Sequence, residues 1–132
     1  MDKIFLDTNI VIDLLEQREG FYQDAIKIFQ MGLHHELSLW VSPITFSTAS
    51  YLLRKHENAN KLLNNLRLLV SISTLDQTVV DDAISSEFDD KEDAMQYFSA
   101  LKANASCIIT RNKKDFTMSE IPVYTPTEFL SR

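Results

Sequence analysis

The stretch Ile4-Phe5-Leu6-Asp7-Thr8-Asn9 decides the fold class, because it joins an apolar run directly to a carboxylate, a hydroxyl and a carboxamide. The apolar run predicts a short buried strand at 4–6, and the pattern that follows predicts a helix at 9–17. A strand that leads into a helix is typical of open α/β sheets, which bind ligands at the carboxyl ends of their strands. We therefore expect Asp7, Thr8 and Asn9 to lie at a functional site.

The remaining hydrophobic periodicity predicts that strands and helices alternate along the chain. Strands are predicted at 38–41, 70–73, 107–110 and 123–124, and helices at 21–33, 45–55, 58–69, 76–87, 90–103 and from Pro126 onwards. Four phenylalanines with helical spacing are predicted to be core residues, namely Phe21, Phe29, Phe46 and Phe98. Such alternation predicts a parallel sheet with helices on both faces, and a chain of 132 residues fits one domain, 1–132.

The composition limits where this chain works and what it binds. It is 45% hydrophobic and poor in Gly and Pro, which is typical of a protein with a packed core. The single Cys107 excludes a disulfide framework and favours the cytoplasm. No apolar stretch approaches the roughly 20 residues that span a bilayer, so we expect no membrane role. The net charge of −6 argues against non-specific coating of DNA, although bound divalent cations reverse the charge of a carboxylate site.

Three carboxylates fall at comparable places in the predicted sheet. Asp7 ends the first strand, Asp93 lies in the first turn of a predicted helix, and Asp115 follows a later strand by five residues. Each also has a simple structural explanation, since Asp93 complements the helix dipole and Asp115 can end a turn. Asp90 is either the N-cap of that helix or a further metal-facing carboxylate. Together at one sheet edge the three acids predict a site for Mg²⁺ or Mn²⁺, because hard cations select oxygen ligands.

Four stretches, taken in order, form a recognisable pattern over nearly the whole chain. They are Phe5-Leu6-Asp7-Thr8-Asn9, Trp40-Val41-Ser42-Pro43-Ile44-Thr45, Glu92-Asp93-Ala94-Met95-Gln96 and Ile108-Ile109-Thr110-Arg111-Asn112-Lys113-Lys114-Asp115-Phe116. With this order and spacing the chain resembles the PIN domain family, which includes many metal-dependent ribonucleases and the VapC-type toxins. The resemblance implies an α/β fold, a three-layer α/β/α sandwich with a central, mostly parallel sheet of four to five strands. It also implies cleavage of RNA phosphodiesters by acids that bind Mg²⁺ or Mn²⁺.

The resemblance assigns roles to individual positions. Asp7, Asp93 and Asp115 match three family acids, and Asn9 and Thr110 would orient water or phosphate by hydrogen bonds. The fourth family acid corresponds to Thr48, and no Asp or Glu occurs between Glu36 and Glu57. Thr48 brings no charge, although its hydroxyl could bind a metal-bound water. We therefore expect a weak metal site, or one that substrate phosphate completes.

The function that the resemblance implies is a ribonuclease, for example the toxin of a toxin–antitoxin pair, whose antitoxin would insert a basic side chain into the acidic site. Homodimers are common among such toxins. Arg111, Lys113 and Lys114 are candidates for binding RNA phosphate, or form only a solvated turn. One alternative is a PIN-fold module that binds RNA or protein with reduced or lost catalysis, which Thr48 favours. Another alternative is a phosphotransfer domain, but such sites require a second Asp at the position where this chain has Asn9.

Overall fold

The computed structural model describes residues 1–132, and its five strands form one sheet in the order β3-β2-β1-β4-β5. The strands are β1 (Lys3–Leu6), β2 (Ser38–Val41), β3 (Ser71–Ile72), β4 (Cys107–Ile109) and β5 (Val123–Tyr124). Every neighbouring pair is parallel. The predicted α/β class with a mostly parallel central sheet of four to five strands is therefore confirmed, with five strands.

The helices connect the strands in the alternation that the sequence predicts. They are α1 (Thr8–Leu15), α2 (Tyr22–Leu33), α3 (Pro43–Leu52), α4 (Ala59–Leu69), α5 (Gln77–Ser85), α6 (Lys91–Lys102) and α7 (Pro126–Ser131), with one 3-10 helix, η1 (Lys113–Phe116). None of them is both long and apolar enough to cross a membrane.

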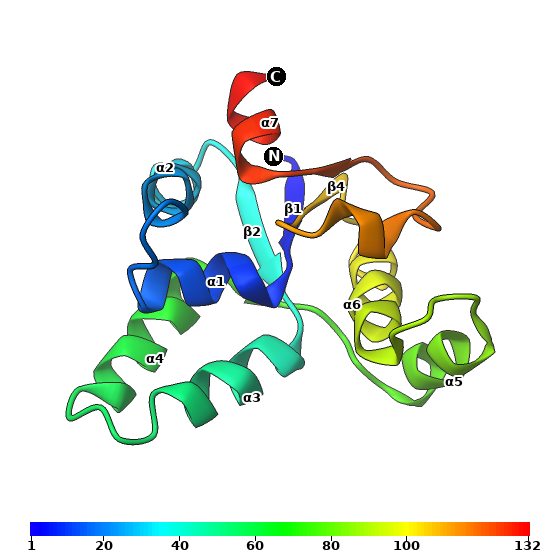
Figure 1. The fold of residues 1–132 in the computed structure, drawn as a ribbon, viewed down its shortest axis with the longest axis horizontal. Helices are drawn as coiled ribbons and strands as arrows, with labels where there is room; N and C mark the ends of the chain where they lie inside the picture. The colour runs from blue at the N-terminus through cyan, green and yellow to red at the C-terminus, as the bar shows by residue number, and fades with distance from the viewer.

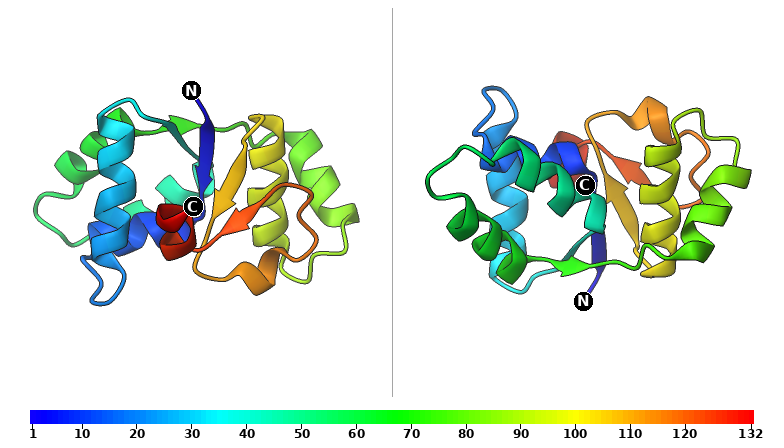
Figure 2. Two further views of the ribbon diagram at one scale, coloured as in Figure 1. Left: turned by 90° about the horizontal axis from the view of Figure 1, so that it is seen from above. Right: turned by 90° about the horizontal axis from the view of Figure 1, so that it is seen from below.

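The sheet lies between two layers of helices, with α1, α2 and α4 on one side and α5 and α6 on the other (Figures 1 and 2). Successive strand residues point to opposite faces, so β1 contributes to both cores. Ile4 and Leu6 pack in the cluster that includes Ile10 of α1 and Ile28 of α2. Phe5 packs in the second cluster, with residues of α5 and α6 such as Ala94. This arrangement is the three-layer α/β/α sandwich expected above.

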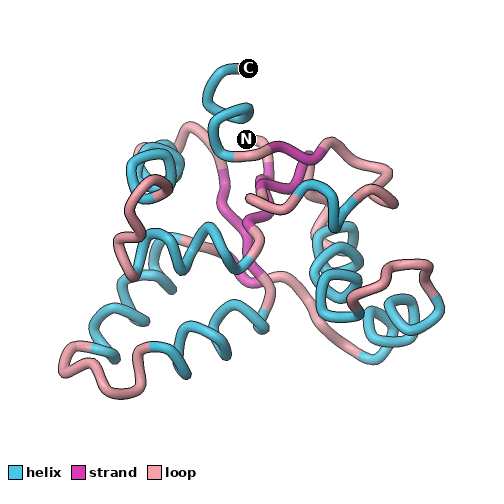
Figure 3. Tube along the Cα trace, viewed as in Figure 1, coloured by secondary structure: helices cyan, strands magenta, loops and turns pink.

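The carboxyl ends of the five strands lie at one edge of the sheet, because all the strands are parallel. The arrow of β2 points to this edge in Figure 1, and α1 and α3 begin there. The turns from β1 into α1 and from β2 into α3 are short (Figure 3). Asp7, Ser42 and Thr125 follow β1, β2 and β5, and each side chain accepts a backbone N–H bond at the start of the next helix. The sequence thus places helix-capping polar residues along the edge where ligands bind in α/β sheets.

Most element boundaries shift by one to three residues from those predicted, and two differences concern the site. Helix α3 begins at Pro43, two residues earlier than expected, because the Ser42 hydroxyl caps it and proline suits the first helical position. The 3-10 helix η1 was not predicted, since four residues are too few to show a hydrophobic period.

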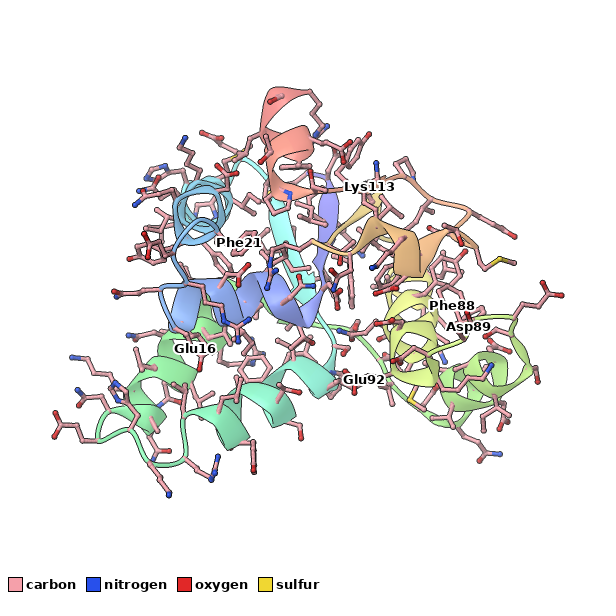
Figure 4. All side chains as sticks on the ribbon, viewed as in Figure 1. Glu16, Phe21, Phe88, Asp89, Glu92 and Lys113 are labelled. Carbon is pink, nitrogen blue, oxygen red and sulfur yellow. The ribbon has the colours of Figure 1, made fainter.

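The prediction that Phe21 is a core residue is wrong. Its side chain is 44% exposed, and it lies beside the start of α2 (Figure 4). The guanidinium of Arg111 covers the ring, 4.0 Å from the ring centroid. Phe29 is buried as predicted, and Phe46 and Phe98 are half-buried. Helical spacing therefore identified the inward face of α2 but not the residue just before its first turn.

Candidate active site

Asp7 stands at the junction of β1 and α1, and hydrogen bonds hold its carboxylate from both sides. Its Oδ1 accepts the backbone N–H of Thr8 at 2.8 Å. Its Oδ2 accepts the hydroxyl of Thr110 at 2.7 Å and the side-chain amide of Asn9 at 3.4 Å. Only 7% of Asp7 is exposed. The carboxylate is therefore fixed between the ends of the neighbouring strands β1 and β4.

The surroundings of Asp7 act on its charge in opposite directions. Burial raises the pKa of its carboxyl group, and the negative charge of Asp115 raises it further. The hydrogen bonds from Thr110, Thr8 and Gln96 lower the pKa, but burial has the largest effect, so the net shift is upward. A buried carboxylate of this kind gains most from a nearby cation.

Asp93 brings a second carboxylate to the site from the first turn of α6. Asp90 caps this helix by accepting the backbone N–H of Asp93 at 3.1 Å, so the N-cap expected for Asp90 is confirmed. The Asp93 side chain does not accept the backbone N–H of Asp90 in return. Burial raises the pKa of Asp93 to about 7, and the negative charges of Asp7, Asp90, Asp115 and Glu92 add to the shift.

Asp115 lies in η1 and is exposed. It lines a pocket of about 210 Å³ whose other acidic residues are Glu87, Asp89, Asp90 and Asp93. The loop that carries Asp89 leads into α6 in Figure 4, where Glu92 lies near the start of the same helix. Asp93 and Asp115 thus line one acidic pocket. Asp7 lies near enough for its charge to raise the pKa of Asp93, and the charge of Asp115 raises the pKa of Asp7.

The donor set at this edge suits a hard divalent cation, because it consists of carboxylate oxygens without thiol or imidazole. No three acidic, histidine or cysteine side chains are arranged closely enough to hold a metal ion by themselves. Mg²⁺ keeps several waters and is commonly bound by one or two carboxylates together with substrate phosphate. The residues therefore fit a site that water and phosphate complete, rather than a closed cage of protein ligands.

Helix α3 contributes hydroxyl groups to this edge and no carboxylate. The hydroxyls of Thr45 and Thr8 lie 2.9 Å apart, so the buried Thr45 reaches the β1–α1 junction. Thr48, one turn further along, is half-buried and makes no side-chain hydrogen bond. The structure thus places no acid on α3 where the family resemblance implies one.

The basic residues that follow β4 differ in their contacts. Arg111 donates to the buried Asp13, at 2.7 Å from Nε and 3.2 Å from the terminal nitrogen. Lys113 pairs with Glu128 at 3.1 Å. Lys114 makes no salt bridge and lines the acidic pocket beside Asp115. Among the three candidates for RNA binding, Lys114 is therefore the one that forms no ion pair, while Arg111 is held in a structural ion pair.

Two residues of the site were missed from the sequence, Gln96 and Asp13. Gln96 is buried on α6 and donates to Asp7 at 3.3 Å and to Thr8 at 2.9 Å. Its position three residues after Asp93 places both on one helix face, which is the one signal that could have identified it. Asp13, whose carboxylate binds Arg111, lies four residues after Asn9 on α1. The same helical spacing is the signal that could have identified Asp13.

A family model described as PIN domain matches residues 3–114. The chain belongs to the PIN domain family. Ribonuclease VapC1 of Aquifex aeolicus (strain VF5) is 27% identical over 139 residues, which cover 99% of this chain and 95% of that protein.

Two solved structures show the same PIN fold. VapBC-1 from nontypeable Haemophilus influenzae aligns with a TM-score of 0.68 at 20% identity, over 95% of this chain and 98% of that one. VapBC2 from Rickettsia felis, bound to a DNA fragment from its promoter, aligns with a TM-score of 0.67 at 16% identity, over 92% of this chain and 96% of that one. At these identities the likeness concerns the fold, and it agrees with the family assignment.

Proposed function

We propose that this PIN domain protein is a metal-dependent ribonuclease that hydrolyses RNA phosphodiester bonds. The observation that carries the proposal is the gathering of acids at the carboxyl edge of the sheet, where Asp93 and Asp115 line one pocket and the nearly buried Asp7 follows β1. Uncompensated carboxylates in a pocket are a feature of sites that bind a functional cation. The similarity to Ribonuclease VapC1 supports the reaction type.

In this proposal Asp7 and Asp93 would hold Mg²⁺ or Mn²⁺, and Asp115 would hold a second ion or a water of the ion's outer shell. An ion bound there would supply a lowered pKa for water and positive charge to offset the phosphate. Thr110 and Asn9 keep the Asp7 carboxylate in one orientation by their hydrogen bonds at 2.7 and 3.4 Å. Lys114, free of any salt bridge, attracts the phosphate backbone toward the acidic pocket.

The proposal is tested by the cleavage of a labelled RNA in the presence of Mn²⁺. We expect cleavage by the wild type and a loss of about 100-fold or more in Asp7→Asn, because a ligand of the cation that would stabilise charge in the transition state is removed. Asp82→Asn, which alters an exposed acid on α5, is the matched control and should cleave as the wild type does. Cleavage that survives both Asp7→Asn and EDTA would show that another site or a contaminant is responsible.

A second candidate function is a PIN-fold module that binds RNA or protein with reduced or lost catalysis. The observation that favours it is Thr48, which leaves α3 without an acid. The variant Thr48→Glu separates the two functions in the same cleavage assay. If the wild type does not cut RNA and Thr48→Glu does, the binding module is the better description; if the wild type already cuts, three acids suffice.

A protein partner is the third part of the proposal. Structures of similar fold include VapBC complexes, and we infer that this chain acts as the toxin of such a pair in the cytoplasm. A basic side chain of the antitoxin would occupy the acidic pocket beside Asp93 and Asp115. Expression of the chain alone should arrest growth, and co-expression of the protein encoded next to it should relieve the arrest. Growth arrest that persists in Asp93→Asn would exclude the nuclease as the cause.

A homodimer, common among PIN-type toxins, stays a prediction, as does the organisation of residues 1–132 as a single domain. Sedimentation equilibrium of the purified chain tests the first. A mass of twice 15.2 kDa would support a dimer, and a mass of 15.2 kDa at all concentrations would exclude it.

A further inference from the structure

Gln96 is a buried polar residue to which the proposed mechanism gives no role. Its side chain is 1% exposed and lies on α6, the helix that carries Asp93. Its Nε2 donates to Asp7 Oδ1 at 3.3 Å and to Thr8 Oγ1 at 2.9 Å. A buried amide that donates both of its N–H groups to the β1–α1 junction fixes the distance between that junction and α6.

Ser42 determines which way the Gln96 amide points. The Ser42 Oγ accepts the backbone N–H of Ile44 at 3.2 Å, as the N-cap of α3. Its own hydroxyl proton therefore goes to Oε1 of Gln96, with which it forms a close hydrogen bond. The amide oxygen is thus held toward α3, and the amide nitrogen, which can only donate, is held toward the Asp7 carboxylate.

The contacts of Gln96 join three elements that meet at the candidate site. Ser42 caps α3, Asp7 follows β1, and Gln96 lies one helical turn after Asp93 on α6. No buried side-chain nitrogen or oxygen in the structure lacks a hydrogen-bond partner, so this network is complete as it stands. Complete buried networks of this kind give a site one geometry.

We propose that Gln96, oriented by Ser42, is a positioning residue that sets the spacing of Asp7 and Asp93 for a divalent cation. It supplies by hydrogen bonding part of the organisation that an acid at position 48 would otherwise supply by ligation. This inference rests on the proposed function, because it concerns the same metal site. It explains how α3 takes part in the site without a carboxylate.

The test is Mn²⁺ binding to the full chain, followed by the electron paramagnetic resonance signal of free Mn²⁺, which needs no RNA and no turnover. Gln96→Met keeps the length of the side chain and removes both polar ends, and it should weaken Mn²⁺ binding by about tenfold or more. Ser42→Ala, which leaves the amide in place, should weaken binding in the same direction. The double variant should bind no more weakly than Gln96→Met, because Ser42 acts through Gln96.

Ser99→Ala is the matched control for general damage to α6. Ser99 is also fully buried on this helix, and its hydroxyl donates to Thr74 O at 2.6 Å, away from Asp7. The Ser99→Ala variant should melt at a lower temperature than the wild type and bind Mn²⁺ as tightly. Unchanged binding in Gln96→Met, or an equal loss in Ser99→Ala, would overturn the role of Gln96 while leaving the proposed function intact. If Gln96→Met does not fold, wild-type binding in Ser42→Ala would overturn it. Absence of Mn²⁺ binding by the wild type, with inorganic phosphate present as well as without it, would contradict both proposals.

Discussion

Asp7 and Asp93 carry their negative charge in places where the protein alone does not neutralise it. Burial raises the pKa of both carboxyl groups, for Asp93 to about 7, and no lysine or arginine pairs with either. Ionised carboxyl groups whose pKa is raised in the folded state reduce the stability of the fold at neutral pH. Charge that costs stability is typical of a functional position.

Asp93→Asn should therefore stabilise the metal-free protein. The folded-state pKa of Asp93, about 7, lies above the ordinary value of 3.8, so the ionised carboxylate destabilises the fold above that pKa. The wild type in EDTA should gain stability as the pH falls from about 8 to about 6, and the variant should melt a few degrees higher at about pH 8 with less dependence on pH. Thermal unfolding by circular dichroism measures both. Identical melting curves at both pH values would contradict the raised pKa of Asp93.

Arg111 is a structural residue by its contacts, and its removal should destabilise the fold. Arg111→Ala leaves the Asp13 carboxylate, 1% exposed, with only Arg18 at 3.8 Å. Breaking a buried ion pair from one side costs about 3 kcal/mol. Lys113→Ala, which removes an exposed pair with Glu128, should change stability little. Denaturant unfolding of the two variants checks this, and equal stability would show that Arg111 is free to bind RNA.

The residues that sequence could identify are those that the chain places at element ends. Asp7 follows an apolar run and Asp93 follows a capping residue, so both were predictable from local pattern. Gln96 and Asp13 were not, because their partners lie 89 and 98 residues away in the chain. A glutamine or aspartate on a helix says nothing by itself about which buried group it will meet.

At the scale of the elements, the sheet was predictable and the short connecting turns were not. Continuous apolar runs identified the strands around Ile4 and Ile108, because strands of a parallel sheet are buried on both faces. The helix η1 has no such signal, yet it carries Asp115. Its existence follows from the turn at Asn112, whose carbonyl accepts the backbone N–H of Asp115 at 2.9 Å.

The contact of α2 with β2 depends on the lack of a side chain at Gly32. A Cβ added there would lie 2.6 Å from Cδ1 and 2.9 Å from Cγ of Leu39. Gly32→Ala should therefore destabilise the protein by about 1–2 kcal/mol, although alanine favours helix formation. Lys27→Ala, at an exposed position of the same helix, is the control and should be neutral. A Gly32→Ala protein as stable as the wild type in urea would show that Leu39 moves aside without cost.

At the scale of the whole molecule, the sandwich brings residues from distant parts of the chain to one edge. Asp7, Asp93 and Asp115 come from β1, α6 and η1, and they meet because β1 and β4 are neighbours in the sheet. The order of motifs along the chain was enough to predict this meeting. The position of Thr48, one turn past the buried Thr45 on α3, shows that the PIN fold here is intact while its usual set of acids is not.

The most direct measurement of the central claim is the binding of Mn²⁺ to the wild type and to Asp93→Asn, followed by the signal of the free ion. We expect saturable Mn²⁺ binding by the wild type and none by the variant at the same concentrations. Without Asp93, Asp7 should not hold the ion, because its carboxylate already accepts four hydrogen bonds. Equal binding by the two proteins, or none by the wild type, would contradict the claim that these acids form a metal site.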